Sequence, residues 1–241
     1  MAQFSLSYAI EKFPEMLSAV PMTLLVAVVS ILIGLILGLG LALCKIYKVF
    51  LLNRIAIVFV SFMRGTPALV QIYVIFYGIP ALIEFLNTRF GWRLNPLGTP
   101  PIVYAFIAFS LNSAAYQSEI IRSALLSVDV GQMEAAHSIG MNASQSFWRI
   151  IIPQALVVAI PNFGNNFIGL IKATSLAFSV KVMEIMAVAK IIGGDGYRYL
   201  EMYLDASLIY WVICFFFERI FALAEKTLSK HERKMNVGTA S

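Results

Sequence analysis

The feature that most constrains this chain is a series of long stretches without any charged residue. The longest are residues 16–44, 65–83, 94–118 and 150–171. A helix that crosses a bilayer needs about 20 consecutive, mostly apolar residues. The chain is also 60% hydrophobic and only 13% charged, whereas soluble domains average about 45–50% apolar and about 25% charged residues. We therefore expect an integral membrane protein and no second, soluble domain.

These stretches predict an all-α fold with five transmembrane helices. The expected spans are residues 17–44, 55–85, 102–126, 157–189 and 199–223, with an external turn at 193–196. Within the first span, Gly34 and Gly38 have the small-xxx-small spacing of a close helix contact. We expect them to form a packing face.

The distribution of basic residues predicts an external N-terminus and a cytoplasmic C-terminus, because Lys and Arg accumulate in cytoplasmic loops. The segments predicted to be internal contain Lys45, Lys48, Arg54, Arg122, Arg149, Lys226, Lys230, Arg233 and Lys234. Those predicted to be external contain only Lys12, Arg89, Arg93 and Arg198. Orientation thus explains the net charge of +5, and no basic tract is long enough to predict a nucleic-acid partner.

Two of the expected spans are interrupted. In Arg64-Gly65-Thr66-Pro67, glycine loosens the backbone, while proline lacks an N–H and disfavours helical angles in the residue before it. We expect two helical pieces there, and a second break at Pro161. The fourth span also contains Asn162, Asn165, Asn166, Lys172, Lys181 and Glu184. Polar side chains at this depth predict that part of the span lines an interior instead of facing lipid.

Residues 127–153 predict a cytoplasmic helix, a turn and a second short helix. Gly140 can adopt the left-handed angles that end a helix. Asn142 and Gln145 have the spacing of a capping box, and we expect Pro153 to limit the second helix. That helix combines apolar side chains with Trp148 and Arg149. It would form a rigid knob, and amphipathic helices of this kind fit into grooves of partner proteins.

Glu134-Ala135-Ala136, then Gly140, then Ile-x-x-Pro at residues 150–153 resemble the signature loop of ABC importer permeases. Residues 64–67, 112–116, 119–122, 127–128, 131–132 and 140–141 resemble the branch for uptake of polar amino acids. Residues 175–179 also resemble L-cystine systems. The resemblance covers residues 17–223. It implies a single permease domain over 1–241 with the type I importer (MetI-like) fold, a coupling loop at 127–153, and a multi-pass location in the cell (plasma or inner) membrane.

The resemblance also implies the partners. They are a dimer of cytoplasmic ATPases, a second permease subunit (identical or similar), an extracytoplasmic binding protein and the amino acid that it delivers. The chain contains no Gly-x-x-x-x-Gly-Lys-Ser/Thr motif, so we expect ATP and magnesium to bind the ATPases and this chain to be neither an enzyme nor a cofactor protein. Cys44 and Cys214 lack metal-ligand spacing, and we interpret them as small apolar residues. The expected coupling residues are Glu134, Ala135, Ala136, Gly140, Met141, Ser144, Phe147, Arg149, Ile150 and Pro153.

Two helical faces are candidates for the path of the cargo. Asn112, Tyr116 and Glu119 recur at i, i+4 and i+7, which places them on one face. A second face contains Asn162, Asn165, Asn166 and Lys172, whose charge suits a carboxylate. Arg64 is a further candidate. The alternative for all of them is structural: polar side chains pair between helices, and Arg64 satisfies carbonyls that the broken helix exposes.

One position departs from the branch pattern, since Ala173 follows Lys172 where the branch usually has an aspartate. Either another acid, such as Glu119 or Glu184, compensates, or the position tolerates the change. A rival interpretation makes Glu119, Lys172 and Glu184 the charge relay of an ion-gradient transporter or channel. An intramembrane enzyme is disfavoured because Gly-x-Ser-x-Gly and His-Glu-x-x-His are both missing.

Overall fold

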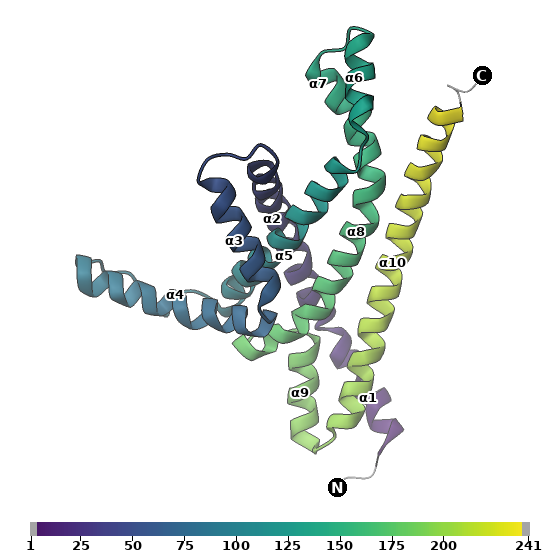
Figure 1. Cartoon of the computed structure of the whole chain (residues 1–241). Helices are drawn as coiled ribbons and strands as arrows, with labels where there is room; N and C mark the ends of the chain where they lie inside the picture. The colour runs from purple at the N-terminus through teal and green to yellow at the C-terminus, as the bar shows by residue number, and fades with distance from the viewer. Residues whose placement is uncertain (1–3, 238–241) are drawn as a thin grey trace.

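The computed structural model describes residues 4–237, and every regular element in that range is helical (Figure 1). The elements are α1 Leu6–Leu17, α2 Val20–Ile46, α3 Leu52–Gly65, α4 Ala68–Phe90, α5 Pro101–Leu126, α6 Val130–Ser138, α7 Ala143–Ser146, the π-helical turn η1 Phe147–Ile151, α8 Ile152–Ala173, the 3₁₀ helix η2 Thr174–Val180, α9 Ile185–Gly196 and α10 Tyr199–Val237. The predicted all-α class is confirmed. The tail cations Lys230, Arg233 and Lys234 lie where α10 is described without its side chains.

Four segments are long and apolar enough to cross a membrane by themselves: Val20–Ile46, Ala68–Phe90, Ala143–Val180 and Tyr199–Leu228. The remaining predicted span is α5, which packs against α2, α3, α4 and α8 at the centre of the bundle. Its buried side chains include Ser113 and Gln117, because neighbouring helices shield this helix from lipid. The first residues of the bundle and the end of α10 lie at opposite ends (Figure 1), as an odd number of crossings requires.

The predicted glycine face of α2 is confirmed, and it packs on α5. A Cβ atom added to Gly34 would lie 2.8 Å from the Ser113 side chain, and one on Gly38 would lie 3.0 Å from the Ala114 carbonyl oxygen. Neither glycine can gain a side chain without separating the two helices. This contact fixes α5 in the position from which it lines the site described below.

The predicted break at residues 64–67 is also confirmed. Helix α3 ends at Gly65, Thr66 is extended with φ −117° and ψ 147°, and α4 begins at Ala68. From this point α4 turns away from the rest of the bundle (Figure 1). Only Gln71 and Ile72, both in its first turns, are buried.

The predictions for the two later prolines were wrong. Pro153 does not limit the second short helix, because η1 joins α7 to α8 and Pro153 falls in the first turn of α8, where a missing N–H is tolerated. Pro161 does not break α8 either. It removes one backbone hydrogen bond, but α8 is held against α10, where a Cβ on Gly164 would lie 2.7 Å from the Phe221 ring.

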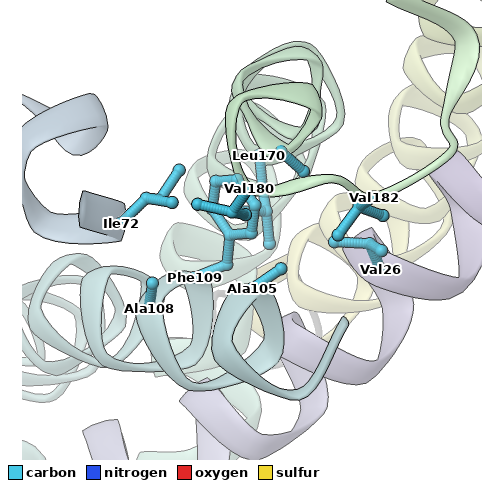
Figure 2. Packing of buried hydrophobic residues seen from close by; sticks show 9 residues of the cluster. Val26, Ile72, Ala105, Ala108, Phe109, Leu170, Val180 and Val182 are labelled. Carbon is cyan, nitrogen blue, oxygen red and sulfur yellow. The ribbon is translucent and has the colours of Figure 1, made fainter. Parts of the chain in front are cut away.

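The second break occurs instead at residues 174–184. There η2 ends at Lys181, whose φ is +66°, and Glu184 caps α9 by accepting hydrogen bonds from the N–H groups of Met186 and Ala187. Val180 and Val182, on either side of Lys181, are buried among residues of α2, α5 and α8 (Figure 2). The segment between α8 and α9 is therefore anchored by its apolar side chains.

The predicted external turn at residues 193–196 is shifted. These residues form the last turn of α9, and the chain reverses at Tyr197, which has φ +53°. A Cβ on Gly193 would lie 2.9 Å from the Tyr199 ring. The glycines thus allow α10 to begin close to α9, instead of forming the turn.

Candidate functional site

A cavity of about 460 Å³ lies where the broken helix, α5 and α8 meet. It brings together residues from both predicted path faces. The lining residues are Thr66, Ala68, Asn112, Tyr116, Ile120, Asn162, Asn165, Asn166, Gly169, Leu170 and Ala173. Amide and hydroxyl groups dominate its polar lining, so the site can bind a small polar solute through directed hydrogen bonds.

The end of the cavity at the helix break is organised by Gln71, which sequence reasoning missed. Its side-chain Nε2 donates to the carbonyl oxygens of Met63 and Thr66, at 2.7 and 3.0 Å, and its Oε1 accepts from Asn112 Nδ2 at 2.8 Å. Gln71 thereby satisfies carbonyls that the interruption deprives of helical donors. A glutamine placed just after a Gly-Thr-Pro break was the available signal.

Arg64 reaches the cavity through Tyr116. Its guanidinium carbon lies 5.6 Å from the centroid of the Tyr116 ring, which is a cation–π distance. Arg64 is exposed, and no acidic side chain in the described part of the chain pairs with it. The break therefore places a cation beside the cavity wall.

The asparagines of α8 are not equivalent. Asn162 Nδ2 donates to the carbonyl of Val158 at 2.8 Å, within its own helix. Asn165 lines the cavity and is exposed. Asn166 Nδ2 is buried, and the described residues offer it no hydrogen-bond partner. A buried amide without a partner carries a free-energy cost, and a bound solute can remove it.

Glu119 does not line the cavity. Its carboxylate pairs with Lys45 of α2 and with Arg122, whose guanidinium lies 2.9 Å away. Glu119 thus belongs to an ion cluster that joins α2 to α5. It shares a helical face with Asn112 and Tyr116, but its charge is already neutralised by two cations.

Lys172 is exposed on α8, and its neighbours Gly169 and Ala173 line the cavity. Neither Glu119 nor Glu184 contacts it: Glu184 accepts from two backbone N–H groups and from the Tyr210 hydroxyl, at 2.7 Å. The two acids expected to compensate for Ala173 therefore have other partners. The three residues of the rival relay also do not contact one another.

The segment predicted to couple to an ATPase is a helical hairpin that projects from one end of the bundle (Figure 1). Gly140 has φ +83°, and Asn142 and Gln145 form the predicted capping box with both hydrogen bonds present. Of the candidates, Glu134, Ala135, Gly140, Ser144 and Arg149 are exposed, Met141, Phe147, Ile150 and Pro153 are half-buried, and Ala136 is buried. Exposed apolar side chains also mark the hairpin, with Ile139 at 76% and Trp148 at 65%.

Residues 30–230 match the family of binding-protein-dependent transport system inner membrane components. The chain belongs to this family. With several membrane-crossing helices, it is a multi-pass protein of the cell membrane.

Similar members of the family carry related names. The L-cystine transport system permease protein TcyL of Bacillus subtilis (strain 168) is 40% identical over 222 residues, which is 92% of this chain and 90% of that protein. The nopaline transport system permease protein NocM of Agrobacterium fabrum (strain C58 / ATCC 33970) is 38% identical over 236 residues, covering 96% and 95% of the two chains.

Solved structures agree with this assignment. A chain of "an amino acid ABC transporter with histidines" superposes with a TM-score of 0.79 at 30% identity, over 94% of this chain and 100% of that one. The MetNI methionine ABC transporter, in an inward-facing conformation, has a TM-score of 0.63 at 17% identity, over 95% and 99% of the chains. The second comparison concerns the fold alone.

Proposed function

We propose that this family member is the permease subunit of an ATP-driven amino-acid importer and that its cargo passes through the cavity at the helix break. The observation that carries the proposal is the convergence of Asn112, Tyr116 and the α8 asparagines on one cavity inside a membrane bundle. Polar groups at membrane depth are costly unless they bind a partner or a solute. Relatives named for L-cystine and nopaline support an amino acid or a derivative as cargo.

The hairpin of α6 and α7 is the proposed contact with the ATPase dimer, which would bind the ATP and magnesium. Ile139 and Trp148 leave apolar surface exposed on this projecting hairpin, and exposed apolar surface is a common feature of protein interaction sites. Gly140, with its positive φ, sets the angle between the two helices. A stiff projection of this shape suits a groove in a soluble partner.

A second permease subunit, identical or similar, is the proposed neighbour of α4. This helix leaves the bundle, and beyond its first turns it is not buried by any described part of the chain (Figure 1). The rings of Tyr73 and Tyr77 lie 6.0 Å apart on this helix, tilted by 35°, and aromatic side chains are enriched at protein interfaces. An extracytoplasmic binding protein would deliver the cargo to the opposite end from the hairpin.

The test is reconstitution of the chain with its candidate ATPase and binding protein in liposomes. The Gly140→Asp variant places a charged side chain at the exposed, left-handed turn of the hairpin, and we expect it to lose ATPase co-purification. Asn142→Ser is the matched control, because serine keeps a helix cap and should retain the ATPase. Import of labelled amino acid under an ion gradient, with no ATPase bound, would overturn the proposal.

A further inference from the structure

The buried side chain of Gln71 uses its whole donor capacity at the helix break. Only 5% of the residue is exposed. Its Nε2 faces three acceptors, namely the Met63 carbonyl, the Thr66 carbonyl and the Thr66 hydroxyl at 2.7, 3.0 and 2.8 Å. An amide nitrogen has two hydrogens to donate to these acceptors. If the amide were turned around, its oxygen would face three other oxygens and could make no hydrogen bond with the two carbonyls. The network therefore fixes which atom of the Gln71 amide is the nitrogen and which is the oxygen.

This assignment fixes the next amide in turn. Gln71 Oε1 is left as an acceptor, and Asn112 Nδ2 donates to it at 2.8 Å. Asn112 must present its nitrogen to Gln71, so its Oδ1 is turned away from that contact. Asn112 lines the cavity, and no described donor binds its Oδ1. The wall of the cavity thus offers a hydrogen-bond acceptor whose direction is set by Gln71.

A cation lies beside the same wall, over the ring of a residue one helical turn from Asn112. Tyr116 follows Asn112 by four residues, which is about 6 Å along a helix. The unpaired guanidinium of Arg64 lies over its ring. An acceptor on the cavity wall and a cation beside that wall are complementary in charge to the ammonium and carboxylate of an α-amino acid. Arg64 does not itself line the cavity; its guanidinium lies beside the wall, over the ring of the lining residue Tyr116.

We propose that the cargo binds in one orientation, with its α-ammonium donating to Asn112 Oδ1 and its carboxylate toward Arg64, and that Gln71 is the positioning residue that holds Asn112 for this purpose. The proposal rests on the proposed function, which makes the cavity the cargo site. It adds that Gln71 acts on cargo only through Asn112.

The experiment uses the complete reconstituted importer and three labelled probes, L-cystine, L-arginine and L-glutamate. The readout is the amount of probe imported per ATP hydrolysed in the presence of loaded binding protein. Asn112→Leu removes the acceptor, and we expect roughly a tenfold loss of import per ATP, the effect of one hydrogen bond to a charged group. Asn112→Asp keeps an oxygen for the ammonium but has no N–H to donate to Gln71 Oε1, so we expect it to lose import per ATP to about the same degree as Asn112→Leu.

Gln71→Leu should lower import per ATP to a similar degree. The decisive variant is the double Gln71→Leu/Asn112→Leu, because residues that act through one another are not additive. We expect the double variant to import no less per ATP than Asn112→Leu alone. If Gln71 only stabilised the break, its loss would lower the yield and ATPase of the complex and would add to the effect of Asn112→Leu.

The possible failures are distinguishable. Unchanged import per ATP in Asn112→Leu or in Asn112→Asp, or additive losses in the double variant, would each overturn the inference while the importer assignment stands. If Gln71→Leu does not assemble, the two Asn112 variants still decide the matter. Import of none of the probes by the wild-type complex would instead overturn the proposed function, and the inference with it.

Discussion

At the scale of single residues, Lys181 takes a backbone conformation that costs stability. Its φ of +66° and ψ of 24° lie in the left-handed region, which glycine enters freely and other residues only at about 1–2 kcal/mol. The side chain is exposed and makes no hydrogen bond or ion pair with the described residues. Lys181→Gly should therefore raise stability by about 1 kcal/mol, seen as a higher melting temperature of the purified complex.

Lys172→Gly is the matched control for this substitution. Lys172 is also an exposed lysine, but it lies in the last turn of α8, where glycine costs about 1 kcal/mol relative to good helix formers. The two variants lose the same charge and should move the melting temperature in opposite directions. A drop for both would show that the lysine charge, and not the backbone, determines the change.

Residue types that belong in the site could be read from the sequence, but their partners could not. Asn112, Tyr116 and the α8 asparagines were predicted from helical periodicity, and the structure places them on one cavity. Gln71 was missed because a single glutamine in an apolar helix has no periodicity. Glu119 shares the predicted face but is neutralised by Lys45, which is remote in sequence. Pairing across helices is a tertiary property that spacing along one helix does not contain.

At the scale of elements, the contact between α2 and α5 positions one wall of the cavity. A Cβ on Gly38 would meet backbone atoms of Ala114 and Ser118 at 3.0 and 3.1 Å, and backbone cannot move aside as a side chain can. Gly38→Ala should therefore destabilise the protein by about 1–3 kcal/mol through overpacking. Gly40→Ala is the control, since nothing lies within 4 Å of its added Cβ and alanine favours helix. Thermal unfolding of both variants checks this, and equal melting temperatures would contradict the close packing.

Helix interruptions could be predicted only where the sequence itself forces them. Gly65 and Pro67 act together on the residue between them, and the break occurs there. Pro161 acts alone within a helix packed on α10, and one lost hydrogen bond is outweighed by that contact. The true break after Ala173 has no proline or glycine. Its course is set by Val180 and Val182, which are buried against other helices, and that information is not local.

At the scale of the whole molecule, one continuous rod connects the projecting hairpin to the cavity. Helical structure runs from Ala143 through η1 and α8 to Ala173 without interruption, and α8 lines the cavity from its middle, at Asn162, to its end, at Ala173. Because Pro153 and Pro161 leave the rod intact, a displacement at the hairpin is transmitted along its length. We infer that the stiffness of this rod couples ATP hydrolysis to movement of the cavity wall.

Softening the rod between its two ends should therefore uncouple the importer. Leu156→Gly/Val157→Gly lies on α8 between hairpin and cavity, and two glycines cost a helix about 2 kcal/mol. In reconstituted importer we expect ATPase stimulation to persist while import per ATP falls several-fold. The control pair Trp211→Gly/Val212→Gly weakens α10 equally at two exposed positions but leaves the rod intact, so its import per ATP should stay near the wild-type value. If both pairs lowered ATPase and import in parallel, general destabilisation would account for the loss, and the two ends of α8 would have to be coupled through other helices.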